Sequence, residues 1–326
     1  LQLFSIGTFV LNQDGSRTLD GNGNPIPTYD QKTVEEFARV FTGWILAPTL
    51  PGPSGIGGTV PNYRDPMRVR VSGGFEDYHD KGPKTLLNGF QLPAGQAQAA
   101  ELGAAIDNIA FHTNVAPFIS KQLIQHLVTS NPSPSYVARI ASAFASNVNS
   151  PTQLYDVVRA ILLDTEARGD FIDPATQPNY GKLREPVQFI TNLLRAFNAN
   201  SDGVLNSLNV GGSSIGAADM SQDVFNAPSV FSFYPPSARV PGENALGPQF
   251  AIFSSLTSLR RANFANRAIF SNIPAAPPNR PTGTSIDLSP WDPLASNPEQ
   301  LIEALNQLLL HGAMSAEMRQ SILTAV

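Results

Sequence analysis

Apolar residues recur at helical spacing along most of this 326-residue chain, and the two-residue alternation of β-strands is almost absent. From residue 98 onward, successive segments place apolar residues three or four positions apart, as amphipathic helices do. We expect helices at 99–112, 114–128, 134–147, 151–166, 184–199, 248–268, 297–311 and 315–326. The chain is therefore predicted to be all-α, a multi-helix globular domain with long ordered loops.

Two strings of turn residues interrupt this pattern near the start of the chain. They are Asn-Gln-Asp-Gly at 12–15 and Asp-Gly-Asn-Gly-Asn at 20–24, and they predict a small N-terminal β-hairpin over residues 9–29. The second string resembles a calcium loop, but Pro25 and Gln31 stand where such a loop needs Gly and Glu. We therefore expect no bound metal there.

A helix is predicted over residues 30–47. Asp30 or Thr33 can cap its first turn, and Phe41 belongs to an apolar stripe that we expect to be buried. Residues 48–96 are rich in Gly and Pro and carry little periodicity. So long an irregular segment is uncommon in a compact protein unless it is functional or disordered, and its aromatic and charged residues favour an ordered loop.

The organisation of the chain is predicted to be simple. We expect one helical domain over residues 1–326, with linker-like loops at 200–219 and 273–298, where Gly, Ser, Asn and Pro accumulate. Both ends of the sequence lie within apolar runs. The chain is therefore expected to be a fragment of a longer protein.

Composition excludes several classes of function. The formal net charge is −5, which argues against a nucleic-acid partner, because phosphate binding needs a concentrated basic face. The chain has no cysteine, which excludes disulfides, thiolate nucleophiles and Cys-ligated metals. No apolar run approaches the roughly 18 residues of a transmembrane helix. Only 14% of residues are charged, and together with the many Asn, Ser, Gly and Pro residues and the lack of cysteine this favours an extracellular or periplasmic protein. No cofactor is expected.

His79, Asp80 and Lys84 form the sharpest candidate site. A histidine beside a carboxylate can act as a base or a ligand, and a lysine can bind an anion or keep the carboxylate ionised. All three lie in a loop flanked by Gly and Pro, where functional residues concentrate. The alternative is a polar clip, in which Asp80 caps the following turn and Lys84 pairs with it.

We expect the loop that carries these three residues to dock on the predicted helix 114–128. That helix carries a polar strip that includes Lys121, and His112 precedes its start. Catalytic roles are therefore assigned as hypotheses to His79, Asp80, Lys84, His112 and Lys121. The alternative for His112 is a residue that joins two helices and bonds to the backbone.

Two further carboxylates stand close to basic residues. Glu36 and Arg39 lie three positions apart on a predicted helix, and Glu185 follows Arg184, so ion pairs are expected at both places. Glycoside cleavage needs an acid and a base, which Glu36, Glu185 and Asp80 have the chemistry to supply.

A segment rich in Pro and aromatic residues follows residue 224. Its aromatic side chains form either a surface for sugar stacking or protein docking, or an anchor for a long loop. They are Phe225, Phe231, Phe233 and Tyr234.

Six strings, in the same order along the chain, resemble the motifs of one bacterial family, and the resemblance covers essentially the whole chain. They are Leu1–Gly7, Glu36–Arg39 with Thr42-Gly43-Trp44, His79-Asp80 with Gly82 and Lys84, His112-Thr113 with Phe118-Ile119 and Lys121–Leu123, Leu183–Phe189, and Gln222 with Phe225, Pro228 and Val230. The chain thus resembles the family catalogued as domain of unknown function 1800. The resemblance implies an exported protein, often encoded beside a sulfatase-like partner.

Two functions are consistent with these observations. The first is a non-catalytic cell-surface or assembly protein that acts with its sulfatase-like neighbour. The second is an extracellular hydrolase that acts on a polymer such as polysaccharide through the His79, Asp80 and Lys84 loop. The arrangement of these side chains discriminates between them, because a hydrolase needs them around an open pocket.

Overall fold

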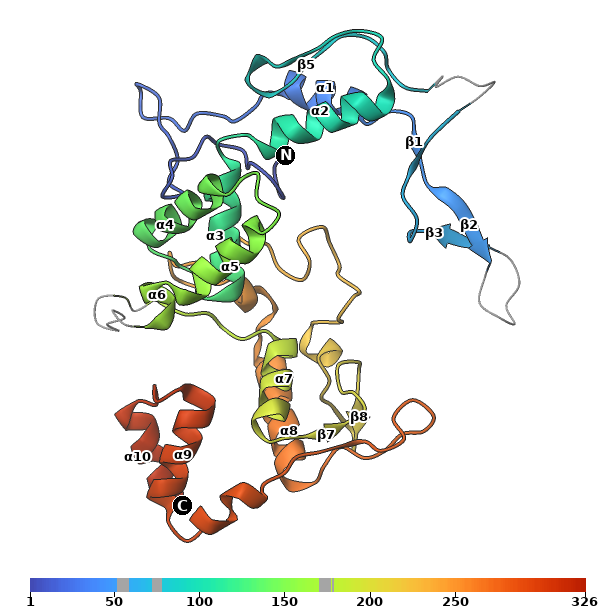
Figure 1. Ribbon diagram of the computed structural model, residues 1–326. Coiled ribbons are helices and arrows are strands. Elements are labelled where there is room, and N and C mark those ends of the chain that lie inside the picture. Colours follow the sequence, from blue (N-terminus) through green and yellow to red (C-terminus); the bar gives the residue numbers. More distant parts are fainter. Residues whose placement is uncertain (52–58, 72–77, 170–176, 178) are drawn as a thin grey trace. The chain divides into compact units, whose positions relative to one another are not determined.

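The computed structural model describes residues 1–51, 59–71, 78–169, 177 and 179–326. The chain divides into two compact units, Leu1–Tyr180 (unit 1) and Gly181–Val326 (unit 2), where the sequence predicted one domain. Helices dominate both units, and the described strands pair only into small two-stranded sheets (Figure 1). The all-α prediction is therefore correct in its emphasis on helix and misses these pairs. No helix in the described ranges is long and apolar enough to cross a membrane.

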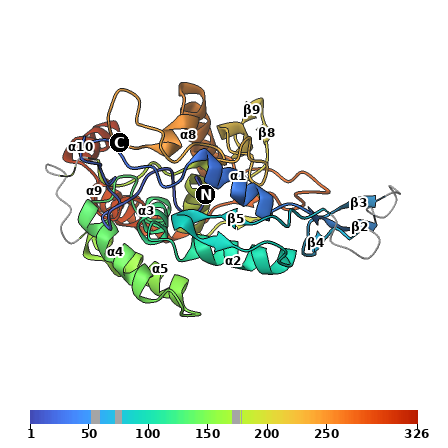
Figure 2. The ribbon, with the colours of Figure 1, turned by 90° about the horizontal axis from the view of Figure 1, so that it is seen from above.

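Most helices of unit 1 lie close to the ranges expected from periodicity. They are α1 Gln31–Val40, α2 Gln98–Ala110, α3 Val115–Leu127, α4 Pro134–Ser146, α5 Gln153–Leu163 and α6 Thr165–Arg168. α3, α4 and α5 pack around a core that includes Ile124, Tyr136 and Ile161, and Figures 1 and 2 show α4 and α5 side by side. The segment predicted as one helix at 151–166 breaks at Asp164, whose carboxylate caps α6.

α1 is shorter than predicted. It ends at Val40, and Gly43 then adopts a φ of +79°, which turns the chain out of the helix. Phe41 is consequently 49% exposed, whereas Phe37 and Val40 are buried. The prediction that Phe41 lies in the core is therefore wrong, because the stripe that included it extended the helix past its true end.

The stretch 48–96 contains short antiparallel strand pairs. β1 Trp44–Ile45 pairs with β4 Arg68–Val69, β2 Ala47–Pro51 with β3 Thr59–Asn62, and β5 Lys84–Thr85 with β6 Gln91–Leu92 around the 3-10 turn η1 Leu87–Gly89. Figure 2 shows β2 and β3 side by side. The expected ordered loop is thus partly sheet, and its residues 52–58 and 72–77 lie outside the described ranges.

The predicted hairpin at 9–29 is a closed triangle of three short extended segments. Val10 N–H donates to the Ile26 carbonyl at 2.9 Å, Thr18 N–H to Val10 at 2.8 Å, and Ile26 N–H to Thr18 at 3.0 Å. Two turns therefore join three segments, where a hairpin has one turn and two strands. We call residues 8–28 the N-terminal triangle.

Asn114 attaches the N-terminal triangle to α3. Its fully buried side chain donates to the carbonyls of Ile6 at 2.9 Å and Phe9 at 2.8 Å, and accepts from Leu11 N–H at 3.0 Å. Asn114 is also the residue that precedes the first turn of α3, the position from which a side chain can cap a helix. Its side chain makes no capping bond, because these distant backbone groups use it.

Unit 2 is built around the helices α7 Pro186–Ala196 and α8 Ser255–Phe270. It also holds α9 Pro298–Leu310, α10 Ala316–Ala325, the 3-10 turns η2 Ala218–Met220, η3 Pro248–Ile252 and η4 Ser289–Leu294, and the strand pairs β7 Asn200–Ser201 with β10 Thr284–Ser285 and β8 Asn209–Val210 with β9 Ser213–Ser214.

Both segments predicted as linker-like contribute to the structure of unit 2. The stretch 200–219 supplies buried apolar residues to the core that Ile190 and Phe264 share, namely Val204, Leu208, Val210, Ile215 and Ala217. The stretch 273–298 contains β10 and η4, and it begins with buried Ile273. The sequence analysis missed these buried positions because they are widely spaced and separated by small polar residues at turns.

Candidate functional site

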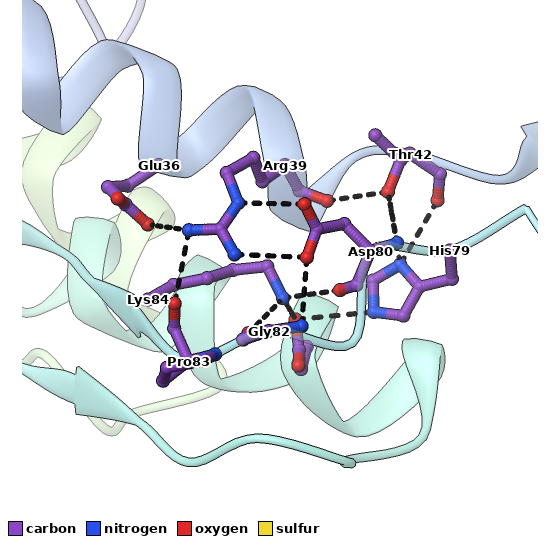
Figure 3. A network of polar contacts seen from close by, with 9 residues as sticks. Glu36, Arg39, Thr42, His79, Asp80, Gly82, Pro83 and Lys84 are labelled. Atoms are coloured by element: carbon purple, nitrogen blue, oxygen red, sulfur yellow. Dashed lines mark hydrogen bonds and ion pairs between the residues drawn. The ribbon is translucent and has the colours of Figure 1, made fainter.

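His79, Asp80 and Lys84 lie together in unit 1, as the sequence predicted. His79 Nε2 is 3.2 Å and Lys84 Nζ is 2.6 Å from the same atom, Oε2 of Glu101 on α2. The side chains of His79, Lys84 and Glu101 are fully shielded from solvent. Together with Asp80, and with Arg39 of α1, they form what we call the polar cluster, whose contacts Figure 3 shows.

The ammonium group of Lys84 has no donor left for a ligand. It donates to the carbonyl oxygen of Asp80 at 2.5 Å, to that of Gly82 at 3.0 Å, and to Glu101. An ammonium group carries three hydrogens, so these three bonds use all of them. Lys84 therefore ties its own loop to α2.

Asp80 is held by Arg39 in a two-point contact. Nε of Arg39 lies 2.8 Å from Oδ2, and Nη2 lies 3.0 Å from Oδ1, which also accepts from Gly82 N–H at 2.8 Å. In Figure 3 the guanidinium sits between Asp80 and Glu36, and the expected pair of Glu36 with Arg39 is present at 2.6 Å. The hydrogen bonds from Arg39, followed by that from Gly82, hold the pKa of Asp80 well below its usual range.

Thr42 and Gly43 place the histidine. Thr42 Oγ1 accepts from Asp80 N–H at 2.9 Å and lies 3.3 Å from His79 Nδ1. A Cβ on Gly43 would stand 3.0 Å from the His79 backbone nitrogen and 3.1 Å from Gln98 Oε1. Only glycine fits this approach at a positive φ, which explains the local need for a Thr-Gly pair between α1 and β1.

Glu101 is the member of the polar cluster that the sequence reasoning missed. It occupies the first turn of α2 and is fully buried, on the same face of the helix as Gln98 and Ala105. A buried lysine needs a compensating carboxylate. This requirement was the signal from which a partner such as Glu101 could have been sought. Within the described residues Glu101 Oε1 makes no hydrogen bond, so half of this carboxylate has unused capacity.

His112 and Lys121 do not join the polar cluster, so the expected docking of the loop on α3 is wrong. His112 Nδ1 accepts from Asn114 N–H at 3.1 Å, the junction role given as its alternative, and burial lowers the pKa of His112. Lys121 lies against Gly15 of the N-terminal triangle. Burial, and then the charge of Arg17, lowers the pKa of Lys121. The loop instead follows α2, which supplies Glu101.

Glu185 makes its contacts within unit 2. Its Oε2 accepts from Gln222 Nε2 at 2.7 Å and from the hydroxyl of Tyr234, while Gln222 Oε1 accepts from Val187 N–H at 2.8 Å. Burial, and then the bond to Glu185, raises the pKa of Tyr234. Of the four aromatic residues singled out, Tyr234 thus anchors its loop, whereas Phe225 is fully exposed.

The comparisons give a family and no activity. In the described parts of the chain, no group of three or more His, Asp or Glu side chains has the geometry to hold a metal ion. No curated protein and no solved structure matches the chain significantly. A family model described as "Protein of unknown function (DUF1800)" matches residues 1–326. The motifs from the Thr-Gly turn to Lys84 build the polar cluster in this fold. They are among the motifs in which the sequence resembles this family. The chain therefore belongs to the DUF1800 family.

Proposed function

We propose that the protein is an exported, non-catalytic cell-surface or assembly protein that acts with a protein partner of the sulfatase-like kind that the family resemblance implies. The observation that carries this proposal is the engagement of Lys84. Its three donors are used within the protein, and its side chain is fully buried. A catalytic lysine needs a free donor or an open approach to substrate.

The charge balance of the polar cluster supports the same function. Arg39 and Lys84 carry two positive charges, and their contacts are made with Glu36, Asp80 and Glu101. Buried or half-buried charges that are paired in this way need no ligand to neutralise them. The polar cluster thus serves as a clip that joins α1, the loop before β5, and α2.

One observation favours the second function, an extracellular hydrolase acting on polysaccharide. His79 Nε2 lies 3.2 Å from Glu101, whose Oε1 has no hydrogen-bond partner among the described residues. A histidine and a carboxylate at this distance have the chemistry of an acid–base pair. Against it, both side chains are shielded from solvent, and a polysaccharide has no access to them in this conformation.

Co-expression with the sulfatase-like neighbour tests the proposal. Size-exclusion chromatography with light scattering is expected to show a complex whose mass is the sum of the two chains. In parallel, the purified protein is assayed for release of reducing ends from polysaccharides. Two results together would establish the hydrolase instead. No complex forms, and the protein cleaves polysaccharide in a way that E101Q abolishes and the exposed-residue control E35Q does not.

A further inference from the structure

A separate hollow of about 200 Å³ lies in unit 1, where α1 begins. One side is formed by the residues that lead into α1 and by its first turn, and the other by residues 85–89 at the β5–β6 turn. Pockets for drug-sized ligands measure roughly 300–1,000 Å³, so this hollow has room for one small unit. None of the residues of the polar cluster lines it.

The rim on the β5–β6 side is firmly held. Asn88 and Gly89 have φ values of +55° and +72°, the left-handed pair of a tight hairpin turn. Leu87, which precedes them, is buried, and its N–H and carbonyl bond to the side chain of Asn108 at 3.1 and 3.3 Å. Local contacts therefore fix the β5–β6 side of the hollow.

Three polar groups around the hollow remain available. Asp30 uses Oδ1 to accept from Thr33 N–H at 2.8 Å and from its hydroxyl at 2.7 Å, which confirms Asp30 as the cap of α1. Asp30 Oδ2, the Lys32 ammonium and the Asn88 side-chain amide make no hydrogen bond with any described residue. Asp30, Lys32 and Asn88, all exposed, line the same hollow and offer a carboxylate oxygen, a cationic donor and an amide to a ligand held there.

We propose that this hollow binds a single uncharged saccharide unit through adjacent hydroxyl groups. Asp30 Oδ2 accepts from one hydroxyl, Lys32 donates to a second, and the Asn88 amide does either. The opposite charges of Asp30 and Lys32 leave the hollow nearly neutral, which disfavours an isolated phosphate or carboxylate. Because unit 1 alone forms the hollow, the inference is independent of the proposed function and of the partner protein.

The test measures binding by isothermal titration and by NMR shifts of the Lys32 and Asn88 amides. The probes are glucose, galactose, mannose and N-acetylglucosamine, with inorganic phosphate and acetate as charged competitors. D30N removes the charged acceptor but keeps a good helix cap, and N88G removes the amide but keeps a residue that adopts positive φ. K81Q changes an exposed lysine outside the hollow and serves as the control.

At least one of these sugars is expected to bind saturably. D30N or N88G should each reduce its affinity about tenfold, as the loss of one hydrogen bond to a charged or well-placed group implies. K81Q should leave the affinity unchanged. The inference is overturned if all four sugars fail to bind the folded protein. It is equally overturned if binding is insensitive to D30N and N88G, or if phosphate or acetate binds the hollow in place of the sugars.

Discussion

The ammonium nitrogen of Lys84 lies 2.6 Å from Oε2 of Glu101, and neither side chain is exposed to solvent. Removing two charges from water is costly, so a buried pair of this kind adds little net stability relative to apolar residues. Removing one partner, in contrast, leaves an uncompensated charge in the interior. The pair therefore specifies how the start of β5 meets α2.

Asp80 is expected to make stability depend on pH at the acid end. Its pKa is lowered in the folded protein, so its contribution is present above the unfolded value of about 4 and is lost as the pH falls through the folded pKa. Because the Asp80 side chain is 37% exposed, D80N should cost no more than about 1 kcal/mol at pH 7. Urea unfolding of both proteins measures this. A difference that grows below pH 4 would contradict it.

Asn114 is expected to be essential for the attachment of the N-terminal triangle. N114A leaves the Ile6 and Phe9 carbonyls and the Leu11 N–H without this partner, and should cost at least about 2 kcal/mol, since each orphaned buried group costs about 1–3 kcal/mol. Limited proteolysis should then cleave within residues 8–28. N114D keeps the acceptor for Leu11 N–H but loses the amide donor. Its stability should lie between those of wild type and N114A, or below that of N114A. Wild-type resistance of N114A to protease would refute the role.

Two phenylalanines of α1 and its C-terminus provide a matched test of the fold. Phe37 is 4% exposed and Phe41 is 49% exposed. F37A should lower the free energy of unfolding by about 3–5 kcal/mol, as core truncations do, and F41A by less than about 1 kcal/mol. Chemical denaturation followed by circular dichroism distinguishes them. Equal losses would mean that α1 extends beyond Val40.

Gln222 is expected to hold two segments of unit 2 together. Q222A removes the partners of Val187 N–H and Glu185, and should cost about 1–3 kcal/mol. Q222E keeps an acceptor for Val187 but places a second carboxylate against Glu185, which should cost more at pH 7 and less as the pH falls and one carboxyl group protonates. A Q222E protein that is as stable as wild type at pH 7 would exclude this contact.

The sequence predicted the helices well because their signal is local. Apolar spacing places α2, α3 and α4 to within a few residues, and Asp30 and Thr33 mark the start of α1. The end of α1 was missed because the apolar stripe continues past Gly43 in sequence, while the chain turns there in space. Gly43 was the residue that carried this information, through its positive φ.

The partners of the polar cluster could be predicted only in part. His79, Asp80 and Lys84 are close in sequence, so their proximity follows from a short loop. Glu101 is 17 residues beyond Lys84, and its position depends on whether the loop docks on α2 or on α3. Tertiary packing decides between α2 and α3. The local pattern of the sequence carries no signal for such a distant contact.

The most direct test of the clip is the thermal stability of K84M, E101L and the double variant. Each single change leaves one buried charge unpaired and should cost about 3–5 kcal/mol, a fall in Tm of roughly 6–20 °C for a unit of this size. The double variant removes both charges and should recover a large part of that loss. Single variants that melt within about 2 °C of wild type would contradict the account, because a group held for catalysis contributes little to stability.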